Sequence, residues 1–221
     1  MTAGLRLEQI CISLGGRRLV TLDADIAPGE VLTVMGPSGS GKSTLLSVVI
    51  GAVPPAFEVS GTVWLDGRDL TGLGPNERRI GILFQDDLLF PHLSVGGNLA
   101  FGLPASLRGR AARRARIEDA LAEADLSGFA DRDPATLSGG QRSRVALMRM
   151  LLATPRALLL DEPFSRLDTS LRAQIQRFVF GQIAARQLPT ILVTHDAADA
   201  CAAGGPVCDL SAPDELNQIA R

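Results

Sequence analysis

The sequence predicts a mixed α/β protein with a mostly parallel central sheet, an antiparallel β region at the N-terminus and an inserted helical segment. Three observations lead to this fold class. Two strand-like stretches follow one another near the N-terminus, buried-looking strands later alternate with helical segments, and residues 86–155 are rich in alanine and arginine without strand patterns. Alternating strands and helices favour a parallel sheet, whose ligand site lies at the carboxyl ends of its strands.

The N-terminal elements are predicted from alternation and turn signals. Residues 5–13 and 17–26 indicate two strands joined by a Leu14-Gly15-Gly16-Arg17 turn, and the first strand alternates apolar and polar residues with period two. A buried strand is expected over residues 31–35. It is followed by a glycine-rich loop and by a helix over about residues 42–51.

Elements in the rest of the chain define the expected domain organisation. The Asp66-Gly67 pair between short strands is the strongest local hairpin signal. Further strands are expected over 79–85, 157–161 and 190–194, and further helices over 169–185 and from residue 197. We therefore expect one functional unit, in which residues 1–85 and 156–221 form the core with its β subdomain and residues 86–155 form a helical subdomain.

Composition and charge narrow the class of protein. The chain has 221 residues, of which 46% are hydrophobic and 21% charged, and its formal net charge is −2. This length supports a core without metal or disulfide staples, and the composition excludes intrinsic disorder. The small net charge argues against nucleic-acid binding through bulk positive charge. Since no stretch of 18 apolar residues and no signal-peptide pattern occur, we expect a protein that neither spans a membrane nor is exported.

A phosphate-binding pattern follows the strand over residues 31–35. Its residues are Gly36, Pro37, Ser38, Gly39, Ser40, Gly41, Lys42, Ser43 and Thr44. In this G-x-x-x-x-G-K-[ST] pattern, glycines let backbone N–H groups converge on phosphate oxygens, and the following helix adds its positive end. Lys42 is the only lysine of the chain, and the other residues in the Lys and Arg count are all arginines. The position thus requires a compact ammonium, which would reach the β- and γ-phosphates, while the Ser43 hydroxyl would bind Mg²⁺.

Two carboxylates follow a second apolar strand. Asp161 stands at the end of the strand over residues 157–161, and Glu162 comes directly after it. Alone, such a pair is usually a solvated loop. In a chain with a phosphate loop it indicates phosphoryl transfer, because Asp161 can hold the Mg²⁺ shell and Glu162 can orient or deprotonate a water.

Residues 137–141, Leu-Ser-Gly-Gly-Gln, precede a helix whose apolar face consists of Val145, Met148 and Leu152. Ser138 is a candidate helix N-cap. A plain capped helix is the simpler interpretation. However, each glycine costs about 1 kcal/mol of helix propensity, which favours a second anion site that another molecule approaches closely.

With these residues the sequence resembles an ABC (ATP-binding cassette) ATPase subunit, specifically the stand-alone cassettes of bacterial thiamine, iron, molybdate and polyamine importers. The matching motifs are Walker A at residues 36–44, the Q-loop at Gln85, the family signature at 137–141, Walker B at 157–163, the D-loop at 165–168 and the switch histidine at His195. The resemblance covers nearly the whole chain in the expected order. It implies a P-loop NTPase (RecA-like) core and a Mg-dependent ATPase activity that converts ATP to ADP and phosphate.

The resemblance also implies roles for the motif residues. Glu162 would be the catalytic base, His195 would sense the γ-phosphate, and Gln85 would couple Mg²⁺ and water to movement of the helical subdomain. The metal ligands would be Ser43, Gln85 and Asp161. The family forms head-to-tail homodimers, in which the Walker A residues of one copy and Ser138, Gly139, Gly140, Gln141 and Asp168 of the other enclose ATP.

The partners implied are integral membrane permease subunits, a second copy of the chain and, indirectly, a solute-binding protein, but no nucleic acid. The resulting location is cytoplasmic, peripheral on the inner face of the plasma membrane. In this family the region over 87–94 receives a coupling helix of the permease, and here residues 89–93 would line the groove. A small apolar core patch is an equally weighted alternative.

Two other functions share part of this pattern. A soluble ABC ATPase acting on nucleic acid or ribosomes is the alternative reading, but the segment between Gln85 and residue 137 has no heptads or zinc pattern. The run over residues 108–116 is its one basic cluster. A small-metabolite kinase would leave Gln85, His195 and residues 137–141 unexplained.

The chain departs from the family where an aromatic residue commonly stacks on adenine. Leu14 stands at this position, and the chain contains no tyrosine. Stacking contributes on the order of 1 kcal/mol. The departure predicts modest affinity for ATP and weak discrimination against GTP.

Overall fold

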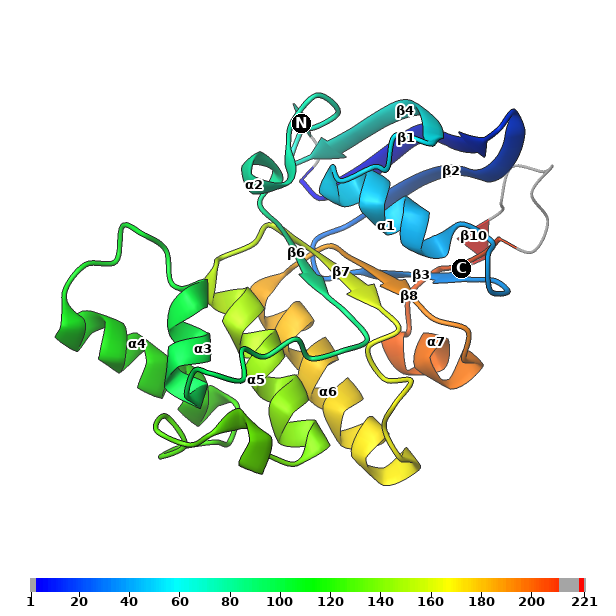
Figure 1. Cartoon of the computed structure of the whole chain (residues 1–221). Helices are drawn as coiled ribbons and strands as arrows, with labels where there is room; N and C mark the ends of the chain where they lie inside the picture. The colour runs from blue at the N-terminus through cyan, green and yellow to red at the C-terminus, as the bar shows by residue number, and fades with distance from the viewer. Residues whose placement is uncertain (1–2, 211–218, 221) are drawn as a thin grey trace. The chain divides into compact units, whose positions relative to one another are not determined.

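The structure is a computed structural model that describes residues 3–210 and 219–220. The chain forms two compact units, whose elements are labelled in Figure 1. The sheet unit contains residues 1–82, 156–162 and 180–221, and the helical unit contains residues 83–155 and 163–179. The helical unit thus includes 163–179, which the sequence analysis leaves in the core. The sequence-derived domain boundaries stay a prediction, because compactness alone does not define a domain.

An antiparallel sheet forms the N-terminal part of the sheet unit. Its order is β2-β1-β4-β5, with β1 at Leu5–Leu14, β2 at Arg17–Ile26, β4 at Phe57–Leu65 and β5 at Arg68–Asp69. The predicted Gly15-Gly16 turn and Asp66-Gly67 hairpin are confirmed, since β1 pairs with β2 and β4 with β5 on either side of them. The period-two alternation of β1 is interrupted by a register shift between Leu7 and Ile10.

The second sheet of this unit has the order β10-β9-β3-β8-β7-β6 in the described part of the chain. Its strands are β3 Val31–Met35, β6 Ile80–Leu83, β7 Ala157–Asp161, β8 Thr190–Val193, β9 Val207–Asp209 and β10 Ile219–Ala220. β3 pairs in parallel with β8 and β9, and β7 with β8, whereas β9 and β10 are antiparallel. Most residues of β3, β7 and β8 are buried, as expected for parallel strands covered on both faces. The predicted α/β class is confirmed.

Helices α1 (Lys42–Ile50), α2 (Pro75–Arg78) and α7 (Ala197–Ala203) belong to the sheet unit, and α6 (Thr169–Arg186) spans the boundary between the units. The loop before α1 follows β3, and β8 lies between β3 and β7. The segments that leave these three neighbouring strands therefore meet at one edge of the sheet.

Arg78 closes the far end of α1. Its buried guanidinium donates to the backbone oxygens of Val48 and Val49 at 2.9 and 3.0 Å, and to those of Leu73 and Thr71 at 2.8 and 3.1 Å. Burial lowers the Arg78 pKa, and the charge of Asp69 opposes this shift. A cation at a helix C-terminus is stabilised by the helix dipole, so Arg78 holds the helix whose other end carries the phosphate loop.

The helical unit contains α3 (Val95–Gly102), α4 (Arg110–Glu123), the short 3₁₀ helix η1 (Pro134–Thr136), α5 (Gly139–Leu152) and the first part of α6. The predicted helical texture of this segment is confirmed. α3 and α5 approach closely, because a Cβ atom on Gly102 would lie 1.9 Å from the Arg149 carbonyl oxygen. Within the described residues, none of the helices is long and apolar enough to cross a membrane.

Candidate nucleotide site

The loop between β3 and α1 adopts backbone conformations that favour glycine. Gly36, Gly39 and Gly41 have φ angles of 151°, 83° and 93°. Gly41 is the N-cap of α1, and no side chain of the described residues caps this helix. A Cβ atom on Gly41 would lie 2.7 Å from Val20 Cγ2. The start of α1 therefore offers backbone N–H groups and the positive end of the helix dipole to an anion.

Two polar side chains of the loop, those of Lys42 and Ser40, could bind such an anion. The Lys42 ammonium is buried and donates to the backbone oxygens of Gly36 and Pro37 at 2.8 and 2.9 Å. The Ser40 hydroxyl oxygen is buried and has no hydrogen-bond partner in the described part of the chain. Burying a hydroxyl without a partner costs free energy. A phosphate oxygen beside Lys42 would remove that cost, so the loop fits a phosphate group.

Asp161, at the end of β7, faces the start of α1. Burial raises the pKa of its carboxyl group and the neighbouring charge of Glu162 raises it further, whereas a hydrogen bond from the Ser43 side chain and the charge of Lys42 lower it. The sequence-predicted residues Lys42, Ser43 and Asp161 therefore come together in the sheet unit. Hydroxyl and carboxylate oxygens form an all-oxygen donor set, which suits a hard divalent cation.

Glu162 and His195 are also brought together. Glu162 has a φ of 47°, an uncommon conformation for a residue with a side chain. Its N–H donates to the Val193 carbonyl oxygen at 2.9 Å, which ties the end of β7 to β8. The Glu162 Oε2 atom lies 3.2 Å from His195 Nδ1, while the His195 side chain is 61% exposed. Backbone strain of this kind is characteristic of functional sites.

Two residues near His195 were not singled out from the sequence. Thr194 and Asp199 are buried, and the Thr194 hydroxyl donates to Asp199 Oδ2 at 2.6 Å. Thr194 directly precedes the switch histidine but was assigned no role of its own, and Asp199 lies outside the recognised motifs. The available signal was weak: a threonine and an aspartate flank the start of a helix, which usually indicates capping alone.

The start of α5 in the helical unit is capped by its own chain. The Gln141 N–H donates to Ser138 Oγ at 3.3 Å, and the Ser138 N–H donates to Gln141 Oε1 at 2.9 Å. Ser138 is therefore the N-cap that the sequence indicates. A Cβ atom on Gly140 would lie 2.4 Å from Leu171 Cδ1, whereas the nearest atom to one on Gly139 is 3.9 Å away. Packing against Leu171 within the chain thus explains why residue 140 is a glycine, whereas Gly139 has room on its outer side.

The other predicted residues of the helical unit are exposed. Gln85 lies in the loop after β6 and helps line a cavity of about 420 Å³ together with Asp87 and Arg142. Asp168 caps α6, since its Oδ1 atom accepts hydrogen bonds from the N–H groups of Ser170 and Leu171, both at 3.1 Å. These bonds lower the Asp168 pKa. Gln85, Asp168 and residues 138–141 therefore belong to the helical unit, and the phosphate loop, Asp161, Glu162 and His195 to the sheet unit.

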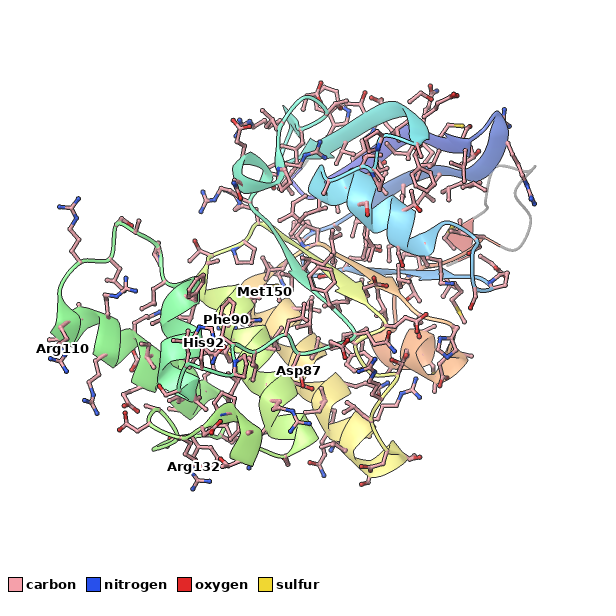
Figure 2. All side chains as sticks on the ribbon, in the orientation of Figure 1. Asp87, Phe90, His92, Arg110, Arg132 and Met150 are labelled. Carbon is pink, nitrogen blue, oxygen red and sulfur yellow. The ribbon has the colours of Figure 1, made fainter. Side chains whose placement is uncertain are left out.

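The segment over residues 87–94 lies on the surface of the helical unit. Asn98 is buried and fixes it by accepting from the Phe90 N–H at 2.8 Å, and the Arg149 guanidinium donates to the Leu88 carbonyl oxygen at 2.9 Å. The rings of Phe90 and His92, labelled in Figure 2, have centroids 5.9 Å apart. The Phe101 side chain, 4.7 Å from Phe90 between centroids, is 70% exposed. Phe101 and His92 are therefore exposed, whereas Phe90 is half-buried, and the role of residues 89–93 stays a prediction.

Comparison with known proteins identifies the family. The model of the ABC transporter family matches residues 19–165. The chain belongs to this family. It is 50% identical over 196 residues to an uncharacterised ABC transporter ATP-binding protein of Escherichia coli, covering 88% of this chain and 90% of that protein. It is 46% identical over 197 residues to a thiamine import ATP-binding protein of Cereibacter sphaeroides, covering 89% and 83%.

A third relative, a sulfate/thiosulfate import ATP-binding protein of Gloeobacter violaceus, is 45% identical over 176 residues, which cover 80% of this chain and 50% of that protein. The chain is therefore an ATP-binding ABC subunit, an ATPase coupled to transport, built on a P-loop NTPase fold. These relatives are transport proteins and give no support to the nucleic-acid or ribosome alternative.

Proposed function

We propose that the chain is the ATP-hydrolysing subunit of an importer. It works as a head-to-tail homodimer on the cytoplasmic face of the inner membrane, with permease subunits and, indirectly, a solute-binding protein. The observation that carries the proposal is the phosphate loop, which holds the buried Lys42 ammonium, a buried Ser40 hydroxyl with no hydrogen-bond partner among the described residues, and a start of α1 that no described side chain caps. Relatives named for import of thiamine and sulfate support import and a small polar or charged solute.

Residues 36–44 bind the phosphates of ATP. Lys42 exchanges its bonds to loop carbonyls for bonds to the β- and γ-phosphates. The Ser43 hydroxyl and the Asp161 carboxylate would hold Mg²⁺, and Gln85 is the further ligand that the family motif suggests. The ion supplies charge neutralisation and orients the phosphates when bound. A nearby divalent cation also favours the ionised form of Asp161, whose pKa burial otherwise raises.

Glu162 and His195 carry the hydrolytic step. Glu162 orients a water and accepts its proton. Its carboxylate follows Asp161 at the carboxyl end of β7, on the edge of the sheet where the phosphate loop also lies. His195, whose Nδ1 atom lies 3.2 Å from Glu162 Oε2, senses the γ-phosphate.

Residues of the helical unit serve the nucleotide of a second copy. Ser138, Gly139, Gly140, Gln141 and Asp168 form this surface, with the open side of Gly139 leaving room for a phosphate. Gln85 links the nucleotide site to movement of the helical unit. The surface over residues 87–94 with the exposed Phe101 receives the permease. ATP binding closes the dimer and hydrolysis reopens it.

A Glu162→Gln variant tests the nucleotide chemistry. It removes the proton acceptor but keeps the shape of the side chain, so hydrolysis should be lost while ATP binding is kept. Size-exclusion chromatography with light scattering should show a dimer only with ATP and Mg²⁺. Lys42→Ala is the control and should stay monomeric. A monomeric Glu162→Gln protein that still hydrolyses ATP would overturn the proposal.

Affinity purification from gently solubilised native membranes tests the transport role. Mass spectrometry should identify a permease and a solute-binding protein among the copurifying chains. Recovery of only soluble partners or nucleic acid would contradict import and leave the ATPase chemistry intact.

A further inference from the structure

The direction of the His195 side chain depends on its backbone. The imidazole is 61% exposed, and its Nδ1 atom lies 3.2 Å from Glu162 Oε2. A mostly solvated ring receives little orientation from packing. Its position relative to Glu162 is therefore set largely by the residues on either side of it, Thr194 and Asp196.

Thr194 links both sides of His195. Its hydroxyl accepts a hydrogen bond from the Asp196 N–H at 3.1 Å and donates one to Asp199 Oδ2 at 2.6 Å. Its own N–H donates to the Val34 carbonyl oxygen at 3.2 Å, which ties it to β3, the strand that leads into the phosphate loop. One hydroxyl thus joins the residue before His195 to the residue after it and to helix α7.

Asp199 anchors this arrangement. Thr194 and Asp199 are each 1% exposed. A carboxylate buried to this extent is costly unless it is hydrogen-bonded. Asp199 lies in the first turn of α7, where the helix dipole favours a negative charge. Asp196 closes the same turn, since its Oδ1 atom accepts from the Ala198 N–H at 2.8 Å and its carbonyl oxygen accepts from the Asp199 N–H at 3.1 Å.

We propose that the Thr194–Asp199 pair positions His195 against Glu162 and thereby sets the rate of ATP hydrolysis. Both are positioning residues, because they act through the His195 backbone. The inference rests on the proposed function for its effect on hydrolysis. The orientation of His195 can be tested separately, without assuming that the protein hydrolyses ATP.

Thr194→Val is the main variant, because valine keeps the shape of threonine and removes the hydroxyl. Thr194→Ser keeps the hydroxyl and should restore the wild-type behaviour. Thr33→Val is the matched control, since Thr33, on β3, is also a fully buried threonine, but its hydroxyl has no hydrogen-bond partner among the described residues.

The first readout is the NMR spectrum of the two histidines. The chain contains only His92 and His195, so a His92→Ala variant assigns both imidazole signals. Thr194→Val and Asp199→Asn should shift or broaden the His195 signals and leave those of His92 unchanged, and Thr33→Val should leave both unchanged. Unchanged His195 signals in folded Thr194→Val and Asp199→Asn proteins would overturn the inference.

The second readout is a double-mutant cycle on ATP hydrolysis. Small errors in the position of a reacting group cost one to two orders of magnitude. We therefore expect Thr194→Val to lower kcat about tenfold with ATP affinity unchanged, and Thr194→Val to have no further effect in a His195→Ala background. Additive effects would contradict positioning through His195. If His195→Ala itself hydrolyses ATP at the wild-type rate, the proposed role of His195 fails, while the NMR result still decides the orientation.

Discussion

The two helices that carry the main sequence motifs begin in opposite ways. Helix α1 starts at Gly41, which has a left-handed backbone and provides no side-chain cap. The N-cap of helix α5 is Ser138. The side chains of Ser138 and Gln141 each accept a hydrogen bond from the backbone N–H of the other residue, so two backbone donors are satisfied there. An uncapped helix start is less stable alone but open to a ligand.

This difference fits the proposed function, in which α1 binds phosphate within one copy of the chain and α5 contacts the nucleotide of a second copy. At α1, the buried Lys42 ammonium donates to two loop carbonyl oxygens, and the Ser40 hydroxyl has no hydrogen-bond partner among the described residues. At α5, the capped start is stable without any ligand. There, a Cβ atom on Gly139 would meet no atom closer than 3.9 Å, so this glycine leaves space on its outer side. Under the proposed function, the first start binds phosphate within one copy of the chain and the second contacts the nucleotide of another copy.

The largest expected effect is at α1. Lys42→Arg keeps the charge, but a guanidinium is larger and planar and does not fit the buried position that donates to Gly36 and Pro37. We expect hydrolysis to fall by about 100-fold or more, as for loss of one key transition-state contact. A phosphate-release assay measures this, with circular dichroism as the control for folding. If the Lys42→Arg variant kept activity within a few-fold of wild type, the inference that this position requires a lysine would be wrong.

Helix α5 should respond differently to substitution at its two glycines. Gly140→Ala places a methyl group where Leu171 Cδ1 would be 2.4 Å away, so overpacking should cost about 1–3 kcal/mol of stability. Gly139→Ala should change stability by no more than about 0.5 kcal/mol, as for most open surface positions. Urea unfolding measures both.

In the Gly140→Ala background, Leu171→Ala should reduce the loss of stability caused by overpacking, because it removes the atoms that the new methyl group meets. Equal destabilisation by Gly139→Ala and Gly140→Ala would mean that the two glycines share one role. In that case the contrast between a packed and an open face of α5 would be lost.

How far the sequence predicts the structure differs between local and long-range features. The Asp66-Gly67 hairpin, the phosphate loop and the Ser138 cap follow from neighbouring residues, and they are present as predicted. Each depends on backbone conformations that a few adjacent side chains determine. The residue roles inferred from the motifs stay predictions.

Features that depend on distant contacts were not predicted. Arg78 holds the end of α1 across 30 and 29 residues of sequence, and its neighbours give no sign of that contact. The pairing of Thr194 with Asp199 depends on where α7 begins after β8. The packing role of Gly140 depends on α6, a separate element. Sequence periodicity shows which residues are buried but not which partner each one meets.

A smaller effect is expected from the cap of α5. Ser138→Ala removes the acceptor of the Gln141 N–H and should cost about 1 kcal/mol of stability. ATP binding by the single subunit should not change, because Ser138 belongs to the helical unit and the phosphate loop to the sheet unit. Urea unfolding and fluorescent-nucleotide titration give the two values. A loss of ATP affinity in the monomer would show that the two helix starts do not act separately.

The smallest effect concerns the base rather than the phosphates. Leu14 ends β1, is exposed, and pairs across the sheet with Arg17 and Phe57. If binding depends mainly on the start of α1, the base contributes little, and the protein should hydrolyse ATP and GTP at similar rates. Leu14→Tyr supplies an aromatic ring at this position and should tighten ATP binding by about 1 kcal/mol, roughly fivefold. Strong preference of the wild-type protein for ATP would instead mean that other residues recognise adenine, and that the phosphate loop does not dominate affinity.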